Sequence, residues 1–170
     1  MVVAGTIVKN DTGAFLKLVH HPVKFRLFLL KNLPAAYFSG VRVRSANETE
    51  ARVSVPFKWF TRNPFRSTYF ACLSMAAEMS TGLLAMAHLH KRNPPVSMLV
   101  TAVHGSFHKK ATGLVTFICD EGDRIREVIE RAVETGEPQT IEVRSNGYTE
   151  KEELAAVFSI TWSFRVKQKR

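Results

Sequence analysis

Cysteine is scarce in this sequence. Only Cys72 and Cys119 occur among 170 residues, and both lie in apolar segments, which is typical of buried thiols in a reducing compartment rather than of a disulfide framework. Residues 1–13 lack a basic segment followed by an apolar core, which is the pattern of a secretory signal. We therefore predict a cytoplasmic protein.

The motifs of several well-known chemistries are missing. The chain has no glycine-rich phosphate loop and no Ser/His/Asp signature with the spacing of a nucleophile elbow. His104 and His108 have no partner at a recognised metal-ligand spacing, so we predict no metal site and no cofactor. Internal repeats, linkers and low-complexity tracts are also absent. A chain of this length is large enough to form a single domain with a substantial core.

Acidic residues are few, since 15 Asp and Glu stand against 24 Lys and Arg. The formal net charge of +9 and the pI of about 9.9 suit an anionic partner: nucleic acid, an anionic lipid surface or a phosphate-bearing ligand such as coenzyme A. No recognised nucleic-acid-binding motif occurs, so charge alone supports nucleic acid as the partner.

One long apolar run organises the chain. It covers residues 63–88, and within residues 67–87 Glu78 is the only formally charged side chain. The run is long enough to cross a bilayer, but Glu78, several Ser and Thr, and strand-like neighbours argue against a transmembrane segment. Apolar or small residues surround Glu78 on nearly every side of the helix, which predicts burial all round. We expect a buried central helix, capped by Ser67 or Thr68 and continuing through Gly82.

The N-terminal part predicts a helical arm, residues 1–39, that belongs to the same domain as the main body, residues 40–170. Residues 13–38 mix apolar and basic side chains and predict two short amphipathic helices, bent at Pro22 and ending before Pro34. Their basic face can contact a membrane surface, or it can be the solvated side of an arm that packs on the domain.

The main body alternates apolar and polar residues as strands do. We predict a hairpin of strands 41–44 and 50–55, and a second hairpin of strands 96–107 and 111–119 joined at residues 108–110. A surface helix follows, which starts at the acids of residues 120–123, carries an apolar stripe over 125–133 and is capped by Gly136. The chain then forms a strand over 139–145, a turn at Asn146-Gly147 and a last strand over 154–166. This order is that of an α+β domain in which an antiparallel sheet curls around one helix.

At this point the chain resembles the hotdog fold, the thioesterase and dehydratase superfamily in which a sheet of about six strands wraps a central helix and subunits pair into dimers. The resemblance covers residues 40–166. More narrowly, the chain is similar to an uncharacterised thioesterase-like family related to the acyl-CoA thioesterases of the phenylacetic acid pathway. Those enzymes have a loop Asn, a Gly-rich helix start and an acidic helix residue, which Asn63 and Glu78, fifteen positions apart, match in spacing.

This resemblance implies that Glu78 is the general base or nucleophile and that Asn63 orients the attacking water or the base, while the helix N-terminus polarises the thioester carbonyl. Independently of any family, burial is expected to raise the pKa of a carboxyl in an apolar helix. The alternatives are a structural buried carboxylate for Glu78 and a loop-capping role for Asn63.

The remaining candidate residues surround the helix start. Where the family has His-Gly-Gly, this chain has Tyr69-Phe70-Ala71, so the glycine that allows close approach to the backbone is missing. The resemblance assigns substrate contacts to Ser67, Thr68, Tyr69, Phe70, Ala71 and Thr81, and contacts with the phosphates of coenzyme A to Arg66, Lys109 and Lys110. Helix capping and a solvated surface are the alternatives for these two groups.

Three functional hypotheses follow. The first is an acyl-CoA thioesterase that uses Glu78, with the coenzyme A thioester as its substrate and a homodimer or dimer of dimers as its assembly. The second is a non-catalytic hotdog module that binds an acyl ligand or a partner, in which Glu78 is structural and Phe70 closes the site. The third is a basic protein that binds nucleic acid or a membrane surface, and it rests only on the net charge and on the N-terminal arm.

Overall fold

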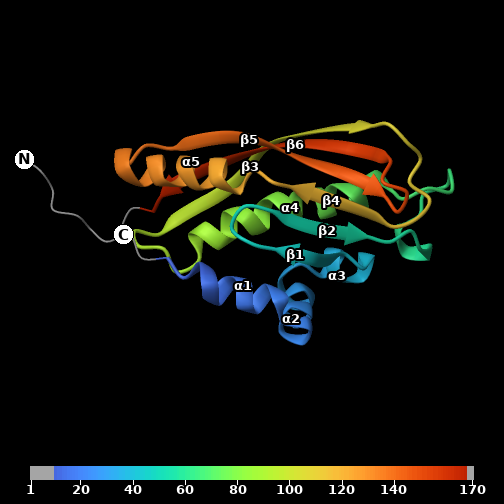
Figure 1. The fold of residues 1–170 in the computed structure, drawn as a ribbon, viewed down its shortest axis with the longest axis horizontal. Coiled ribbons are helices and arrows are strands. Elements are labelled where there is room, and N and C mark those ends of the chain that lie inside the picture. Colours follow the sequence, from blue (N-terminus) through green and yellow to red (C-terminus); the bar gives the residue numbers. More distant parts are fainter. Residues whose placement is uncertain (1–9, 168–170) are drawn as a thin grey trace, which may run out of the picture.

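The computed structural model describes residues 10–167, which form helices and strands in a mixed order (Figure 1). The elements are α1 (Thr12–His20), α2 (Pro22–Asn32), α3 (Pro34–Ser39), β1 (Arg42–Ala46), β2 (Ala51–Val55), the 3-10 turn η1 (Trp59–Thr61), α4 (Phe70–Leu89), β3 (Val96–Phe107), β4 (Val115–Cys119), α5 (Gly122–Thr135), β5 (Gln139–Thr149) and β6 (Leu154–Val166).

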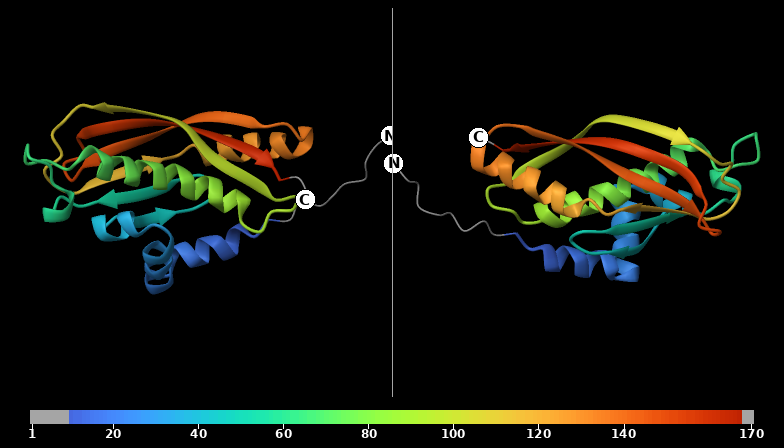
Figure 2. Two further views of the ribbon diagram at one scale, coloured as in Figure 1. Left: turned by 180° about the vertical axis from the view of Figure 1, so that it is seen from behind. Right: turned by 45° about the horizontal axis from the view of Figure 1, so that its top comes forward.

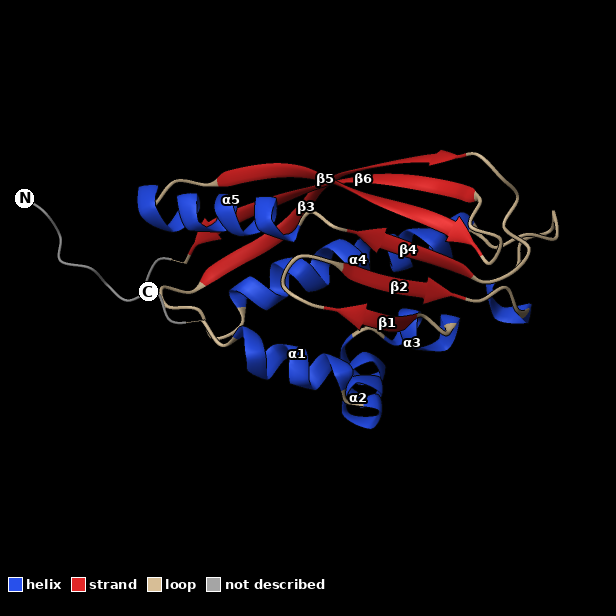
Figure 3. Cartoon of the chain, viewed as in Figure 1, coloured by secondary structure: helices blue, strands red, loops and turns tan. Residues whose placement is uncertain are grey.

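The six strands form one antiparallel sheet in the order β1-β2-β4-β5-β6-β3, which curls over α4 (Figures 1 and 3). The predicted α+β architecture, a curled sheet around a long central helix, is therefore confirmed. The core is built from the inward side chains of the sheet and from α4, with Phe117, Phe164, Leu84 and Ile160 all fully buried.

Helix α4 is the longest helix among the described residues, and it is buried on most of its sides. By length and apolar composition it is the one described helix that could cross a bilayer, but 67% of its most apolar window is buried inside the fold. Its less covered positions, Ala71, Ser74, Met75 and Glu78, recur every three or four residues and so share one face. Glu78 therefore lies on the one stripe of the helix that the sheet does not cover.

The N-terminal arm packs against α4 and β1 rather than joining the sheet (Figures 1 and 2). It contains three helices where the sequence predicts two, because Pro34 begins a further short helix, α3, instead of only ending the second one. Helix α5 lies near β5 and β6 and also contacts α4. The predicted surface helix is confirmed as α5, and Gly136, with φ of 74°, caps its C-terminal end.

The predicted second hairpin is wrong. Strand β3 pairs with β6, whereas β4 lies between β2 and β5. The predicted turn, residues 108–110, and the first residues of the predicted strand, 111–114, instead carry the chain across the sheet to β4. The His108 N–H donates to the Ala155 carbonyl at 2.8 Å in this segment. Alternation of side chains tells which face of a strand is covered, but it does not say which strand is its neighbour.

The predicted turn at Asn146-Gly147 is also wrong, since β5 continues through both residues to Thr149. Gly147 is paired with Phe117 of β4, and a Cβ atom at Gly147 would lie only 2.5 Å from Cε1 of the Phe117 ring. The glycine therefore makes room for a buried ring and is not part of a turn. At the start of α4, the helix begins at Phe70, after Tyr69, so neither Ser67 nor Thr68 caps it.

We predict that Gly147→Ala lowers the free energy of unfolding by roughly 1–3 kcal/mol, because the Phe117 ring is fully buried and cannot move away from an added methyl group. Urea unfolding measures this loss as a lower midpoint. Gly13→Ala is the matched control, since nothing lies within 4 Å of its added Cβ and Ala is the better helix former in α1. Equal midpoints for Gly147→Ala and wild type would contradict this account of Gly147.

Candidate functional site

The Glu78 carboxylate faces a cavity of about 340 Å³ whose other walls are almost entirely apolar. Among residues 10–167, this carboxylate forms no ion pair and accepts no hydrogen bond. Burial raises the pKa of the Glu78 carboxyl above its ordinary value of 4.5. The sequence predicted this rise in the pKa of Glu78, with burial as its cause. The structural alternative would pair the carboxylate with a cation, and the described chain offers no such ion pair.

Three parts of the chain build this cavity, which we call the Glu78 cavity. The walls are Phe15, Phe25, Phe28, Leu29, Asn32 and Leu33 from the arm, Met79, Gly82, Leu83 and Met86 from α4, and Met98 and Trp162 from the sheet. Sequence reasoning did not assign any of these residues to a site. The amphipathic pattern of the arm marks its apolar residues as inward, but nothing local shows that they cover a carboxylate.

Neighbouring residues fix Glu78 in position. The Thr81 hydroxyl donates to the Glu78 carbonyl at 3.0 Å and accepts from the Trp162 indole N–H at 2.9 Å. Thr81, predicted to contact substrate, is fully buried and lines neither cavity described here, so its hydroxyl serves the helix and Trp162. Gly82 leaves space beside the acid, since a Cβ there would lie 3.4 Å from Glu78 Oε1.

A second cavity, of about 530 Å³, opens at the start of α4 and contains most of the other predicted site residues. We call it the helix-start cavity. Its lining includes Asn63, Ser67, Thr68, Tyr69, Phe70, Phe107, Lys109 and Lys110. The structure thus brings together four of the six residues predicted to contact substrate and two of the three predicted to contact phosphates, whereas Ala71 and Thr81 do not line this cavity. Arg66, the third, is exposed in the neighbouring loop and does not line this cavity.

The Asn63 side chain organises the loop before α4. Its Oδ1 accepts from the Phe65 N–H at 3.0 Å, the Ser67 N–H at 3.2 Å and the Ser67 hydroxyl at 3.2 Å. These bonds are those of the loop-capping alternative. The Nδ2 group of the same amide has no acceptor within residues 10–167, so Asn63 can hold the loop and still donate a hydrogen bond to a ligand.

The backbone at the start of α4 supplies further donors. The Tyr69 N–H donates to the Thr61 carbonyl, and the Cys72 and Leu73 N–H groups donate to the Tyr69 carbonyl. No acceptor exists within the described residues for the N–H groups of Phe70 and Ala71, which are the free amides of a helix N-terminus. The buried Thr68 hydroxyl, which lines the helix-start cavity, has no partner either. These groups can stabilise a negatively charged oxygen.

The two cavities share no lining residue. Phe70 and Glu78 are eight positions apart on α4, which corresponds to about 12 Å along a helix axis. Within one chain, therefore, Asn63 and the free amides do not meet the Glu78 carboxylate. A site that uses both needs a second chain.

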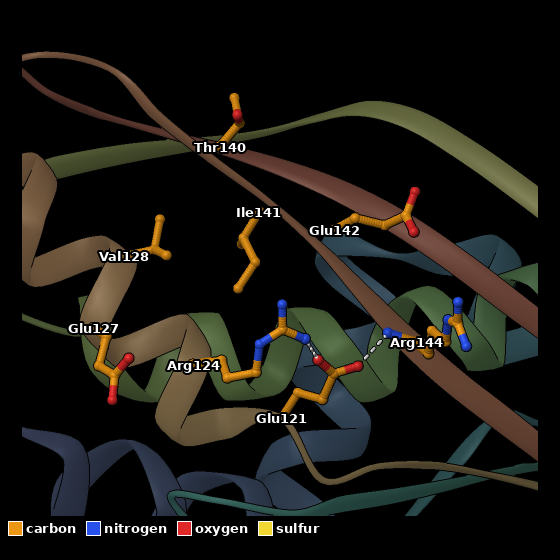
Figure 4. Close-up of a pocket in the computed structure, with 8 residues that line it drawn as sticks. All are labelled: Glu121, Arg124, Glu127, Val128, Thr140, Ile141, Glu142 and Arg144. Carbon is orange, nitrogen blue, oxygen red and sulfur yellow. Dashed lines mark hydrogen bonds and ion pairs between the residues drawn. The ribbon is translucent and has the colours of Figure 1, made fainter.

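A third cavity, of about 680 Å³, lies between α5 and β5 (Figure 4). Arg124 pairs with Glu121, and the backbone N–H of Arg144 donates to Glu121 Oε1 at 2.7 Å. The other charged side chains of its lining, Glu127, Glu142 and Arg144, are exposed. It contains no buried unpaired group, so we do not consider it a candidate reaction site.

Other nucleophiles and metals are not supported in the described chain. Burial raises the pKa of the Cys119 thiol to about 12 and also raises the pKa of the Cys72 thiol, so neither supplies a thiolate near neutral pH. Residues 10–167 contain no cluster of three or more His, Cys, Asp or Glu that could hold a metal ion. Glu78 is the unpaired ionisable group that faces an apolar cavity.

A central helix wrapped by a six-stranded sheet defines the hotdog fold, and solved structures that match this chain have the same fold. A Pseudomonas aeruginosa protein of unknown function, described as a probable thioesterase, is 19% identical with a TM-score of 0.69, covering 92% of this chain and 97% of its own. A thioesterase from Haemophilus influenzae is 16% identical with a TM-score of 0.64, covering 85% and 91%. The PaaI protein of the Escherichia coli phenylacetic acid degradation operon is 13% identical with a TM-score of 0.61, covering 89% and 98%.

The chain belongs to the family described as a domain of unknown function, DUF4442, whose model matches residues 25–164. Comparison with curated proteins finds no match. The expected likeness to a thioesterase-like hotdog family is confirmed by this family assignment together with the structural neighbours.

We predict that Glu78→Gln stabilises the protein at neutral pH. Burial disfavours the charged carboxylate only in the folded state, so the folded pKa exceeds the unfolded one and wild type loses stability as pH rises through this interval. The advantage of Glu78→Gln should vanish below about pH 4.5, where the wild-type carboxyl is protonated in both states. Urea unfolding between pH 4 and 8 measures the difference. A variant less stable than wild type at pH 7 would show that the carboxylate has a stabilising partner.

Proposed function

We propose that this protein is an acyl-CoA thioesterase in which Glu78 is the general base. The observation that carries the proposal is the unpaired Glu78 carboxylate in an apolar cavity, with a pKa raised by burial. A base whose pKa lies nearer neutrality transfers protons more effectively, and an apolar cavity beside it suits an acyl chain. The thioesterase names of two structural neighbours support the same reaction class.

In this reaction, Glu78 removes a proton from water while the water oxygen forms a bond with the thioester carbonyl carbon. The carbonyl oxygen becomes an oxyanion, which the Phe70 and Ala71 N–H groups and the Thr68 hydroxyl, unpaired within residues 10–167, would stabilise. The carbon–sulfur bond then breaks, and the coenzyme A thiolate takes up the proton. The products are a carboxylic acid and free coenzyme A. No step requires a metal or a redox cofactor.

A homodimer can bring these groups together through the edge of the sheet. Among the described strands, β3 is an edge strand of 12 residues that pairs only with β6, and its Leu99, Val103 and Phe107 side chains are at least half exposed. Long edge strands with exposed apolar residues are sites of pairing with another chain. We therefore infer that β3 pairs with the β3 of a second copy about a two-fold axis.

This pairing would complete the site. Phe107, near one end of β3, lines the helix-start cavity, whereas Met98, near the other end, lines the Glu78 cavity. Antiparallel pairing about the middle of β3 sets the Phe107 end of one strand beside the Met98 end of its partner. The helix-start cavity of one chain then adjoins the Glu78 cavity of the other. The site would use Asn63 and the free amides of one chain with Glu78 of its partner.

The substrate would lie across this junction. The acyl group would enter the apolar Glu78 cavity, and the phosphates of coenzyme A would lie outside the helix-start cavity near Lys109 and Lys110. Lys109 is already paired with Glu153, with Nζ 2.5 Å from Oε1, so Lys110 is the freer cation of the two. Arg66, exposed beside the same loop, is available for a more distant phosphate.

A binding module without turnover is the second candidate, and the helix start favours it. Phe70 is 55% exposed and its ring packs edge-on against Tyr69 with centroids 4.9 Å apart, so two aromatic rings stand where a thioester would approach the free amides. Tight acyl-CoA binding with no hydrolysis by wild type would support this module.

We predict that Glu78→Gln lowers acyl-CoA hydrolysis by roughly 10²–10⁴-fold, because the amide cannot accept the proton of the attacking water. A panel of acyl-CoAs of increasing chain length, with release of the free thiol as the readout, measures the rate. Glu134→Gln, which removes an exposed carboxylate from α5, is the matched control and should hydrolyse at the wild-type rate. Undiminished hydrolysis by Glu78→Gln would exclude this mechanism.

We also predict that two inactive variants complement each other. Asn63→Ala and Glu78→Gln each leave a dimer without an intact composite site, but a mixed dimer has one. Refolding the two variants together should restore about a quarter of the wild-type activity, since about half of the dimers are mixed and carry one intact site of two.

Leu99→Lys with Val103→Lys should abolish this recovery, because repulsion between cations at the β3 edge opposes pairing. Light scattering would then report a monomer. Failure of complementation between variants that still form dimers would contradict the composite site.

A further inference from the structure

Helix α2 presents an apolar stripe to solvent that the hotdog body does not cover. Val23, Leu27 and Leu30 are 60%, 59% and 40% exposed and follow one another at helical spacing on a single face. The opposite face is occupied, since Phe25 and Leu29 are buried against the fold. The stripe is therefore an additional surface and not an incomplete part of the core.

Cations border this stripe, and the arm contains no acid after Asp11. No Asp or Glu occurs between Asp11 and Glu48, whereas six Lys and Arg and two His do: Lys17, His20, His21, Lys24, Arg26, Lys31, Arg42 and Arg44. By helical geometry Lys24 and Lys31 follow one side of the stripe, and Arg26 follows the other. None of these cations takes part in an ion pair within residues 10–167.

A cationic cavity of about 210 Å³ lies beside α2 and is lined by His20, Arg26, Arg42 and Arg44 without any acid. Arg26 is held in place, since it donates to the carbonyls of Val41 and Tyr37 and stacks over the Tyr37 ring at 4.0 Å. Arg42 and His20, by contrast, make no hydrogen bond from their side chains to the described residues. The cavity can therefore receive an anionic group next to the stripe.

We propose that the N-terminal arm docks this protein on an anionic membrane surface, with Val23, Leu27 and Leu30 entering the interface and the surrounding cations contacting acidic lipid headgroups. An apolar stripe flanked by Lys and Arg is the pattern of a helix that lies in the plane of a membrane interface. The arm extends outward from the sheet and α4, so that α2 can reach a flat surface (Figures 1 and 2).

The charge pattern favours a membrane over two other possible occupants of this stripe, a second copy of the chain and nucleic acid. A second copy seated on the same stripe would bring Lys24 and Lys31 of both chains together, with no acid of α2 or α3 to pair them. Nucleic acid would satisfy the cations and leave the leucines in water, because phosphates do not bury aliphatic side chains. A bilayer containing acidic lipids buries the leucines and pairs the cations at the same time. This docking does not depend on the proposed hydrolysis.

The test is sedimentation of the full chain with vesicles of phosphatidylcholine alone or of phosphatidylcholine with phosphatidylserine. Wild type should bind the second kind, and added salt should weaken the binding. Lys24→Glu with Lys31→Glu should weaken it by roughly twentyfold or more. Arg131→Glu with Lys151→Glu is the matched control: it makes the same change in net charge on α5 and the β5–β6 turn, and it should bind as wild type does.

The apolar part is tested by Leu27→Ser with Leu30→Ser, which should weaken binding by roughly tenfold at unchanged net charge. Both leucines are exposed, so the urea midpoint should stay at the wild-type value, and so should hydrolysis of a short-chain acyl-CoA. If wild type hydrolyses no acyl-CoA but binds vesicles in this pattern, the docking stands and the proposed function fails.

Four results would overturn the proposal. The first is no binding of wild type to phosphatidylserine vesicles, and the second is an equal loss in the charge variant and its control. The third is vesicle binding that is unchanged in Leu27→Ser with Leu30→Ser, together with equally strong binding of a single-stranded oligonucleotide, which indicates a nucleic-acid surface. The fourth is a fall in the mass measured by light scattering for the serine variant, which indicates that the stripe holds a second copy.

Discussion

The desolvation of one carboxylate is the constraint on which the functional part of this structure depends. Glu78 stands on the least covered stripe of a helix that is otherwise buried, and its carboxyl group forms no ion pair and accepts no hydrogen bond within residues 10–167. An arrangement of this kind lowers stability at neutral pH, since the charged form is better solvated in the unfolded chain. Such a cost at a well-packed site is characteristic of function. The Thr81 and Trp162 hydrogen bonds hold the backbone of Glu78 while leaving its carboxylate unpaired.

Helix α4 serves two sites at once, because its start and its middle face different cavities. The free amides at Phe70 and Ala71 belong to a polar opening shaped by the Asn63 loop, whereas Glu78 belongs to an apolar opening shaped by the arm. The separation follows from the rise of a helix and cannot be closed by side-chain motion. In the proposed dimer the exposed edge of β3 would connect the two openings across a two-fold axis, and it would then have as much influence on the chemistry as any residue of α4.

The sequence was a good guide to features that depend on local pattern. The long apolar run predicted the buried helix, its lone acid predicted the site of desolvation, and alternation located the strands. The errors concern partners that are distant in sequence. Pairing of β3 with β6 could not be deduced from alternation, and Gly147 looks like a turn residue until the Phe117 ring on the neighbouring strand is known.

Residues of the candidate site divide in the same way. Asn63, Thr68, Phe70 and Lys110 lie close together in sequence or at a strand end, and the fold gathers them at one cavity. Thr81 was expected to contact substrate, but its hydroxyl accepts from the Trp162 indole N–H and donates to the Glu78 carbonyl. The aromatic walls Phe15, Phe25 and Phe28 were missed because their cavity exists only once the arm has packed on α4.

The two faces of α2 carry a thermodynamic consequence. Phe25, Phe28 and Leu29 wall the cavity that holds Glu78, and Val23, Leu27 and Leu30 on the same eleven-residue helix point outward. A helix is too stiff for one face to shift without the other, so a ligand that moves α2 from within also moves the surface outside. Linkage then makes the effect reciprocal. If a ligand in the cavity changes the affinity of the outer face for a membrane by some factor, membrane attachment changes the affinity of the cavity for that ligand by the same factor. The arm would thus set the conditions under which the cavity fills and empties.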